Sequence, residues 1–142
     1  MSASRIRLKH AREAVGKAPE DLAEFVGGRS NYYDLEDCDG DLYSTVGLGE
    51  LSNLCSALGI KLRDLFDDRP KIDSAISPGK LLSKALEYLE QNNLTVAEFS
   101  NRIGIEIGPS LRDAGKISEW NIDFLRWLCE ELELDWRLAL PD

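Results

Sequence analysis

The sequence contains few of the residues that build metal centres, disulfide frameworks or membrane spans. It has one histidine, His10, and its three cysteines, Cys38, Cys55 and Cys129, lie far apart with no CxxC pair. Neither a disulfide framework nor a structural zinc site is therefore expected. No apolar run reaches transmembrane length, and no apolar stretch typical of a secretory signal follows the first residues. These absences predict a protein of the reducing cytoplasm that does not engage a membrane.

Basic residues are few, and they are absent from one long stretch of the chain. The chain of 142 residues has 17 Lys and Arg against 26 Asp and Glu, a formal net charge of −9. No Lys or Arg occurs between Arg29 and Lys61, and this stretch holds six acids: Asp34, Glu36, Asp37, Asp39, Asp41 and Glu50. Such a charge opposes binding to DNA and anionic membranes and favours a basic partner. It also serves solubility without any partner.

The motifs of common catalytic and metal centres are missing. His10 lies among basic residues, and no GxSxG or P-loop string occurs. The segment DCDGD, residues 37–41, does not fit an EF-hand loop, because no register places an acid first, glycine sixth and glutamate twelfth. Cys55 and Cys129 stand among leucines, as small core residues do. We therefore predict no enzymatic activity, no cofactor and no metal site.

The sequence does have strong helical periodicity. Leu48, Leu51, Leu54 and Leu58 recur at spacings of three and four residues, and no segment alternates as a strand does. Residues 37–47, rich in Asp and Gly, are expected to form a loop. We predict an all-α fold with helices over residues 6–15, 19–26, 29–36, 48–58, 60–66, 81–89, 96–103, 109–114 and 119–132.

The second half of the chain repeats the plan of the first. APEDLAEFVG (residues 18–27) matches TVAEFSNRIG (residues 95–104) in length, apolar positions and final glycine, and ALGIKLRDLF resembles ELELDWRLAL more weakly. Thr95 and Glu98 have the spacing of a capping box, and Ser118 suits the N-cap of the last long helix. A segment with two prolines and mixed charges separates the halves. We predict two lobes, residues 1–67 and 80–142, joined by a linker at 68–79.

The first lobe also carries a recognisable pattern. RLKHAREAVGKAPEDLAEFVG, then a short polar helix ending in DLE, then LGELSNLCSALGIKLRDLF resembles the lambda-repressor/Cro-like (XRE-type) helix-turn-helix family over residues 6–66. The second lobe is similar more faintly, through its glycine turn and LRDAGK. The resemblance implies two tandem repressor-like bundles of about five helices each, in which the second and third helices form the helix-turn-helix and the third enters the DNA major groove.

By this resemblance the recognition helix spans residues 29–36. The resemblance implies that Tyr33 and Leu35 lie in the core, and that DNA contacts come from Arg29, Ser30, Asn31 and Tyr32, with Asp34 on the same outer face. Arg5, Arg7 and Lys9 of the first helix, beside His10 and Arg12, could meet a DNA backbone, although a charge run of this kind is more often a solvated helix face. This interpretation describes a transcriptional regulator.

Two departures from the family pattern favour another function. Pro19 stands where family members usually place an amide-bearing residue that meets a phosphate, and the acidic string DLEDCDGDLY follows the start of the recognition helix. We therefore favour a surface for a basic protein partner, such as a toxin or nuclease that an immunity- or antitoxin-type inhibitor blocks. Its predicted residues are five acids, Asp34, Glu36, Asp37, Asp39 and Asp41, with Tyr32 and Tyr43 as aromatic anchors.

Several questions stay open at the level of sequence. A scaffold or dimerisation module, in which the helix-turn-helix is only architectural, is a third function beside the protein binder and the regulator. The oligomeric state is open, a dimer included. Trp120, Phe124 and Trp127 have the spacing of a core stripe. A tryptophan left exposed in the second lobe would mark either a contact between lobes or a partner site.

Overall fold

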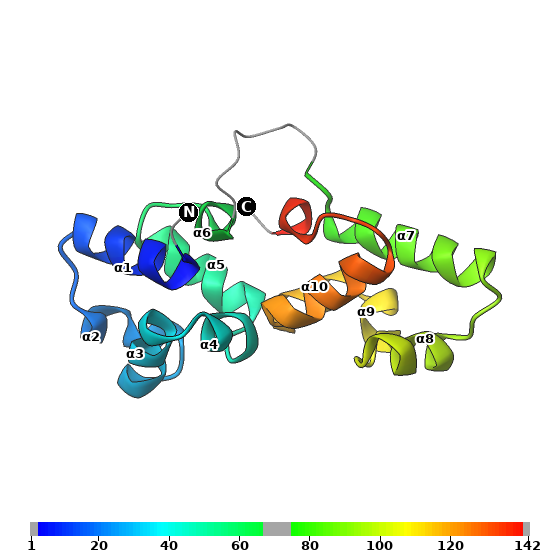
Figure 1. Cartoon of the computed structure of the whole chain (residues 1–142), viewed down its shortest axis with the longest axis horizontal. Coiled ribbons are helices and arrows are strands. Elements are labelled where there is room, and N and C mark those ends of the chain that lie inside the picture. Colours follow the sequence, from blue (N-terminus) through cyan, green and yellow to red (C-terminus); the bar gives the residue numbers. More distant parts are fainter. Residues whose placement is uncertain (1–2, 67–74, 141–142) are drawn as a thin grey trace.

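The computed structural model describes residues 3–66 and 75–140, which fold into helices joined by short turns, with no β-strand among them (Figure 1). The predicted all-α class is confirmed. Most of the predicted linker, residues 68–79, lies outside the described residues, and its last two residues already belong to a helix. None of the described helices combines the length and apolar character that crossing a bilayer requires.

In the first half the apolar side of α5, which we call its central helix, lies in the core. Leu48, Leu51 and Leu54 of α5 have no exposed surface, as their helical spacing predicts. Pro19 begins α2, where its missing N–H costs no hydrogen bond. The elements are α1 (Ser4–Ala14), α2 (Pro19–Leu22), the 3₁₀ turn η1 (Ala23–Phe25), α3 (Arg29–Asp37), α4 (Asp39–Ser44), α5 (Leu48–Ala57) and α6 (Leu62–Phe66).

In the second half the corresponding central helix is α10, which packs against α8 and η3. Its elements are α7 (Pro78–Gln91), α8 (Val96–Ile103), α9 (Gly108–Arg112), the 3₁₀ turn η2 (Ala114–Glu119), α10 (Ile122–Glu131) and the 3₁₀ turn η3 (Trp136–Ala139). The predicted capping box is confirmed, since Glu98 N donates to Thr95 Oγ1 and Thr95 N to Glu98 Oε1. Ser118 is not the N-cap of α10. Asn121 takes that place, accepting from Phe124 N at 2.9 Å, because η2 occupies the preceding residues.

The predicted Asp-rich loop after α3 is instead a helix for much of its length. Asp39 and Asp41 lie in the first turn of α4, where the positive end of the helix dipole favours acids. The Thr45 hydroxyl donates to the backbone carbonyl of Asp41 at 2.7 Å and closes the other end. The composition suggested a turn, but both acids lie in the first turn of a helix.

Left-handed backbone positions recur at matching places in the two halves. Each half has one after its first helix, one before α3 or α9 and one after its central helix, and the first half has a further one at Gly28. The matching pairs are Gly16 and Asn93, Gly27 and Gly104, and Gly59 and Glu133. Non-glycine residues rarely adopt this conformation, so these shared turns indicate that one chain plan is used twice.

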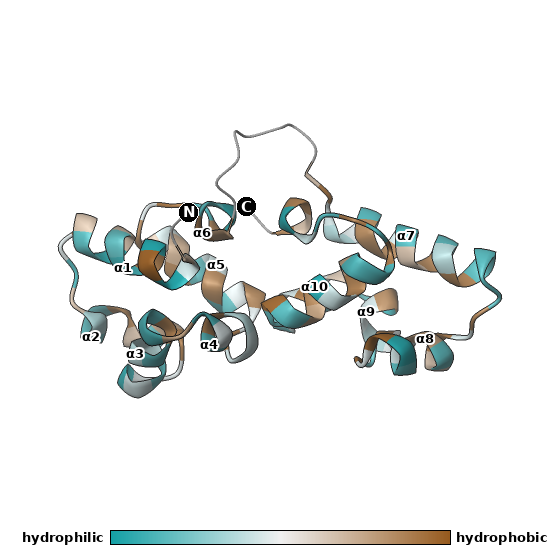
Figure 2. Cartoon of the chain, viewed as in Figure 1, coloured by the Kyte–Doolittle hydropathy of each residue, from teal (hydrophilic) through white to brown (hydrophobic). Residues whose placement is uncertain are grey.

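The two halves meet where their central helices begin. Leu48 N donates to Trp120 O at 2.7 Å, and the Asn121 side chain donates to Ser44 O at 2.9 Å. Gly47 and Asn121, the residues just before α5 and α10, form an isolated antiparallel bridge. The helices carry apolar residues on only part of their circumference (Figure 2). Those residues form a single core cluster that runs through both halves.

An aromatic group covers this junction from one side. The ring centroids of Tyr43 and Phe66 lie 5.6 Å apart, and Trp136 of η3 lies 5.6 Å from Phe66 and 6.3 Å from Tyr43. The Arg126 guanidinium lies 5.5 Å from the Tyr43 ring centroid. Side chains of both halves therefore stabilise one relative orientation, since aromatic pairs and cation–π contacts add to the burial of apolar area.

The turns after α5 and α10 provide a test of the shared plan. Gly59 has φ +73°, with open space where a Cβ would stand, and Glu133 has φ +57°. We expect Glu133→Gly to raise the free energy of unfolding by about 0.5–1 kcal/mol, because the glutamate Cβ strains a left-handed turn. Gly59→Ala should lower it by about 1 kcal/mol for the same reason. Urea denaturation measures both changes, and equal effects of the same sign would contradict this account.

Candidate functional site

The turn into α3 depends on two glycines and one amide side chain. Gly27 and Gly28 have φ values of +83° and +133°, in the region that favours glycine. The Asn31 side-chain amide donates to Val26 O at 3.1 Å and reaches Gly27 O at 3.4 Å. Asn31, which the family resemblance predicted to read DNA bases, is thus engaged in holding the turn.

Two buried residues set the rotation of α3 about its axis. Tyr32 and Leu35 have no exposed surface, and Asp34 and Asp37 consequently face solvent. The prediction of Tyr32 as a surface contact, for a protein or for DNA, is wrong. Burial and the neighbouring Glu36 carboxylate raise the pKa of its hydroxyl. Tyr33, predicted as core, is exposed instead.

Tyr33 and Arg29 lie with Glu20 at the outer end of α3. The Tyr33 hydroxyl donates to Glu20 Oε1 at 2.8 Å, and Arg29 Nε lies 3.1 Å from the same oxygen. The Arg29 guanidinium also lies over the Tyr33 ring, 5.5 Å from its centroid. Hydrogen bonds from its own backbone amide and from Tyr33 lower the pKa of Glu20. The charge of Arg29, a predicted DNA contact, is therefore offset by an adjacent carboxylate.

Glu36 faces inward, contrary to its prediction as a partner-binding residue. Its two carboxylate oxygens accept from Arg12 Nε at 2.8 Å and from Arg12 Nη2 at 3.0 Å. The side chains of Arg12 and Glu36 are only 13% and 10% exposed, and Arg12 also donates to Lys17 O. Hydrogen bonding to Glu36 raises the pKa of Arg12. The pair joins α1 to α3 and is not available to a partner.

The other arginines of α1 also bind the chain itself. Arg5 N donates to Asp39 Oδ1 at 2.8 Å, so Asp39 caps the start of α1. The Arg5 side chain reaches Glu36 O at 3.5 Å, and the Arg7 side chain donates to Leu65 O at 2.9 Å. Arg5 and Arg7, predicted as DNA contacts, therefore hold α1 against α3 and α6. Of the remaining predicted DNA contacts, the structure places Lys9 and Ser30 in solvent.

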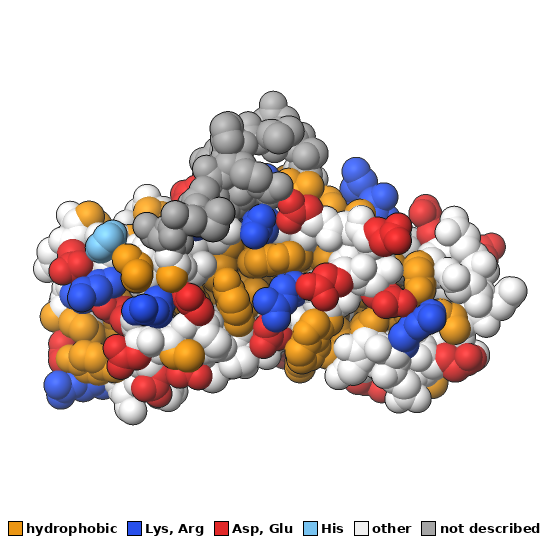
Figure 3. Space-filling view, in the orientation of Figure 1, with side chains coloured by type: hydrophobic (Ala, Val, Ile, Leu, Met, Phe, Trp, Pro, Cys, Tyr) orange, Lys and Arg blue, Asp and Glu red, His pale blue; other side chains and the backbone are white. Residues whose placement is uncertain are grey.

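Three acids remain available to a partner. Asp34 and Asp37 of α3 are exposed and Asp41 of α4 is half-buried, and we call these three residues the acidic α3–α4 surface. Acidic side chains gather over α3 and α4 in the space-filling view (Figure 3). Tyr43, predicted as an anchor beside them, is half-buried in the aromatic group at the junction and presents only part of its ring.

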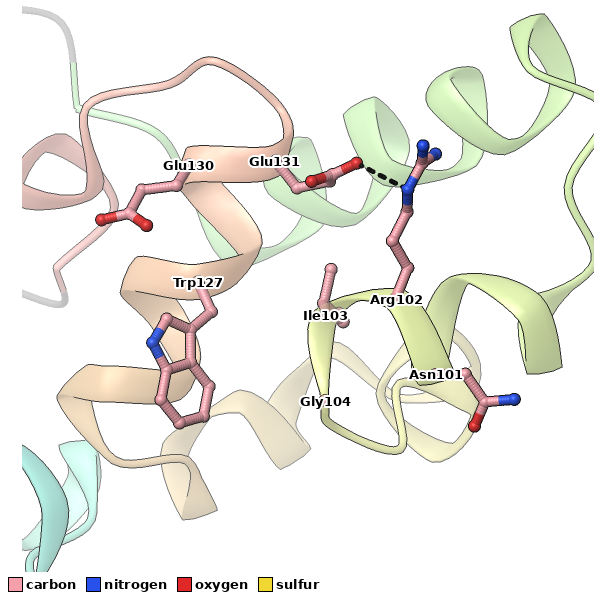
Figure 4. Close-up of a pocket in the computed structure, with 7 residues that line it drawn as sticks. All are labelled: Asn101, Arg102, Ile103, Gly104, Trp127, Glu130 and Glu131. Carbon is pink, nitrogen blue, oxygen red and sulfur yellow. Dashed lines mark ion pairs between the residues drawn. The ribbon is translucent and has the colours of Figure 1, made fainter.

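A cleft lies between α8 and α10. The sequence did not predict the cleft itself, but it did predict that an exposed tryptophan in this half would mark a contact or partner site. The volume of the cleft is about 540 Å³, and its walls come from the end of α8 and the C-terminal half of α10 (Figure 4). The Trp127 side chain stands on one side, 39% exposed, and faces Ile103 and Gly104 on the other. The lining residues are Asn101, Arg102, Ile103, Gly104, Trp127, Glu130 and Glu131.

Hydrogen bonds and ion pairs fix the charged end of this cleft. Arg102 Nε lies 3.3 Å from Glu131 Oε1, and the Tyr88 hydroxyl donates to the same oxygen at 2.6 Å. Arg102 Nη1 in turn donates to the Tyr88 hydroxyl at 3.2 Å. Glu130 points away from this network, and its nearest cation is Arg126 at 3.9 Å. The network holds Glu131 in place and leaves Glu130 at the rim.

The described residues offer neither a cluster of metal ligands nor a reactive thiol at the two buried cysteines. They contain no group of three or more His, Cys, Asp or Glu that could hold a metal ion. Burial raises the pKa of Cys55 and of Cys129 to about 12, so neither thiol is a nucleophile near neutral pH.

Comparison with protein-family models, with curated proteins and with solved structures finds no match for this chain. The function must therefore be argued from the surfaces themselves.

The second half of the chain suggests which residues could replace the buried Arg12–Glu36 pair. By the shared turns and helix ends, Leu89 and Leu111 occupy the corresponding places, and both contact the core. We expect Glu36→Leu alone to lower the free energy of unfolding by about 3 kcal/mol, because it leaves the Arg12 charge unpaired. Adding Arg12→Leu should restore most of that loss. Urea denaturation of the wild-type chain, the two single variants and the double variant measures these free energies of unfolding. If the double variant lost as much stability as the two single variants together, the pairing would be contradicted.

Proposed function

We propose that this chain is a non-catalytic binding protein, built on two tandem repressor-like helix-turn-helix halves, whose acidic α3–α4 surface engages a basic protein partner. Its role would be that of an immunity- or antitoxin-type inhibitor acting in the cytoplasm. The observation that carries the proposal is the exposure of Asp34 and Asp37 on the helix that corresponds to a recognition helix, with the cations around them already engaged.

The geometry of the turns supports the helix-turn-helix assignment. In the first half α2 and η1 lead through Gly27 into α3, and in the second half α8 leads through Gly104 into α9. Both glycines have similar left-handed φ values, +83° and +79°. A short turn between two helices at this place is what the family resemblance implies.

The arrangement of charge favours a protein over DNA. Binding to DNA derives most of its nonspecific free energy from Lys and Arg that neutralise phosphates. Each acid that meets a phosphate instead costs about 1 kcal/mol at 4 Å in water. Arg5, Arg7 and Arg12 bind within the chain, and Arg29 lies against Glu20, so four of the five predicted cationic DNA contacts and their neighbours are engaged. Lys9, the fifth of this set, faces solvent.

One observation favours the alternative, a DNA-binding transcriptional regulator. In Figure 1, α2 and α3 of one half and α8 of the other lie along the same lower edge of the molecule, with α9 set back between α8 and α10. Dimeric helix-turn-helix proteins likewise present two such units to one face of DNA. However, α9 has only five residues, and the acidic α3–α4 surface faces outward from the first half, so we keep the regulator as the second candidate.

A charge-reversal experiment tests the proposal. The immobilised full-length chain would capture proteins from extracts of its own source, beside an Asp34→Lys/Asp37→Lys variant. A Glu87→Lys/Glu90→Lys variant changes two exposed acids of α7 and matches the change in net charge. We expect a basic protein that binds the wild-type chain and the α7 variant at least about tenfold more tightly than the α3 variant, since each ~1.4 kcal/mol of lost attraction weakens binding tenfold.

Equal binding of that protein to both variants would contradict the proposal, because the interaction would then follow net charge and not this surface. Circular dichroism of each variant confirms that the helices persist. The purified pair, measured by calorimetry at two salt concentrations, then gives the affinities on which the comparison depends.

A further inference from the structure

The duplication within the chain gives an internal comparison for α10. From α5 to α10 the buried positions recur at a single offset, and the turns that follow, at Gly59 and Glu133, recur at the same offset. The buried pairs are Leu48 and Ile122, Leu51 and Leu125, Leu54 and Leu128, and Cys55 and Cys129. The packing of the central helix thus explains these residues in both halves.

The solvent-facing side of α10 does not follow the same rule. Phe124, Trp127 and Glu130 stand where α5 has Glu50, Asn53 and Ser56. In the first half the fold forms with an exposed asparagine at the place of Trp127. The fold therefore does not require a tryptophan there, and Trp127 is nevertheless 39% exposed. An exposed tryptophan that packing does not explain is typical of a binding anchor.

The surroundings of Trp127 form a shaped site. The ring centroids of Phe124 and Trp127 lie 5.6 Å apart, so the Phe124 ring limits the orientation of the indole. The indole lines the α8–α10 cleft (Figure 4). Gly104 contributes bare backbone to the far wall, with open space where a Cβ would stand. The space beside the indole can take an extended side chain.

The charges that line the cleft favour a basic side chain from a binding partner. Its lining has two carboxylates, Glu130 and Glu131, and one guanidinium, Arg102, which is paired with Glu131 at 3.3 Å. The Glu130 side chain is 65% exposed and only loosely paired, at 3.9 Å from Arg126. An indole face beside such a carboxylate attracts an arginine or lysine, whose methylene stem also packs on the ring.

We propose that the α8–α10 cleft is a second recognition site, which takes a Lys or Arg side chain of a basic polypeptide between Trp127 and the Glu130 rim. The nature of the occupant rests on the proposed function, since the same partner that meets the acidic α3–α4 surface supplies the cation. The site itself is separate, because it lies on other helices in the other half of the chain.

An NMR titration with a capped hexa-arginine peptide tests this site on the full-length chain. We expect the Trp127 indole signal and the amides of Asn101 and Gly104 to shift, while the signals of Trp120, which is buried, stay in place. Trp127→Asn, the residue that the first half has there, should weaken the affinity read at Gly104 by about tenfold. Trp127→Leu keeps apolar bulk but lacks the ring face, and should weaken it by about fivefold.

Matched controls separate the two sites. Leu86→Asn removes another exposed apolar side chain, on α7, and should leave every affinity unchanged. Shifts at Asp34 and Asp37 with none at Trp127 would overturn the cleft proposal and leave the proposed function intact. Shifts at Trp127 with none at Asp34 and Asp37 would support the cleft and contradict the proposed function. Equal shifts with a capped hexa-glutamate peptide would overturn the charge argument for the cleft.

Discussion

The orientation of the two halves depends on a short stretch of backbone where α5 and α10 begin. Gly47 and Asn121 are bridged there, and Leu48 N donates to Trp120 O. The contact is so close that a Cβ at Gly47 or at Gly49 would stand 3.3 Å from Ser118 O. Because Gly47 and Asn121 occupy equivalent places in the two halves, this contact relates them as an approximate twofold axis would. In this orientation α2, α3 and α8 lie along one edge of the molecule (Figure 1).

Within that frame, the placement of charge decides what each surface can bind. In the first half the arginines of α1 bind inward, to Glu36, to backbone carbonyls and across helices, so most of the local positive charge contributes to stability. The acids that face solvent lack such partners among the described residues near them, and the surface is left with a negative potential. The second half has less acid on the corresponding edge but adds an exposed tryptophan. The proposed partner therefore meets charge on one half and an aromatic anchor on the other.

Local patterns in the sequence predicted much of the fold. The leucine spacing of α5, the Thr95–Glu98 capping box and the glycine turns act within a few residues, and all of them lie where expected. The rotation of α3 was not predicted. One residue turns a helix by about 100°, so an error of a single position exchanged buried Tyr32 and exposed Tyr33.

Long-range contacts explain the other errors. Glu36 faces Arg12 across 24 residues of sequence, and Asp39 reaches Arg5 across 34. The periodicity of the sequence does not reveal contacts between distant residues. Acids that bind within the chain could therefore not be distinguished from acids that are free to bind a partner. The exposure of Trp127 depends in the same way on how α8 packs against α10. Only its difference from Asn53, visible once the halves are aligned, marks it in the sequence.

We propose that the acidic α3–α4 surface serves a protein and not DNA, and fluorescence anisotropy tests this choice. The full-length chain is titrated against a labelled duplex from upstream of its own gene, beside a scrambled duplex, at about 50 and about 200 mM salt. We expect no binding to either duplex, even at the lower salt. Sequence-specific binding that weakens steeply as salt rises would contradict it, and would make the chain a transcriptional regulator.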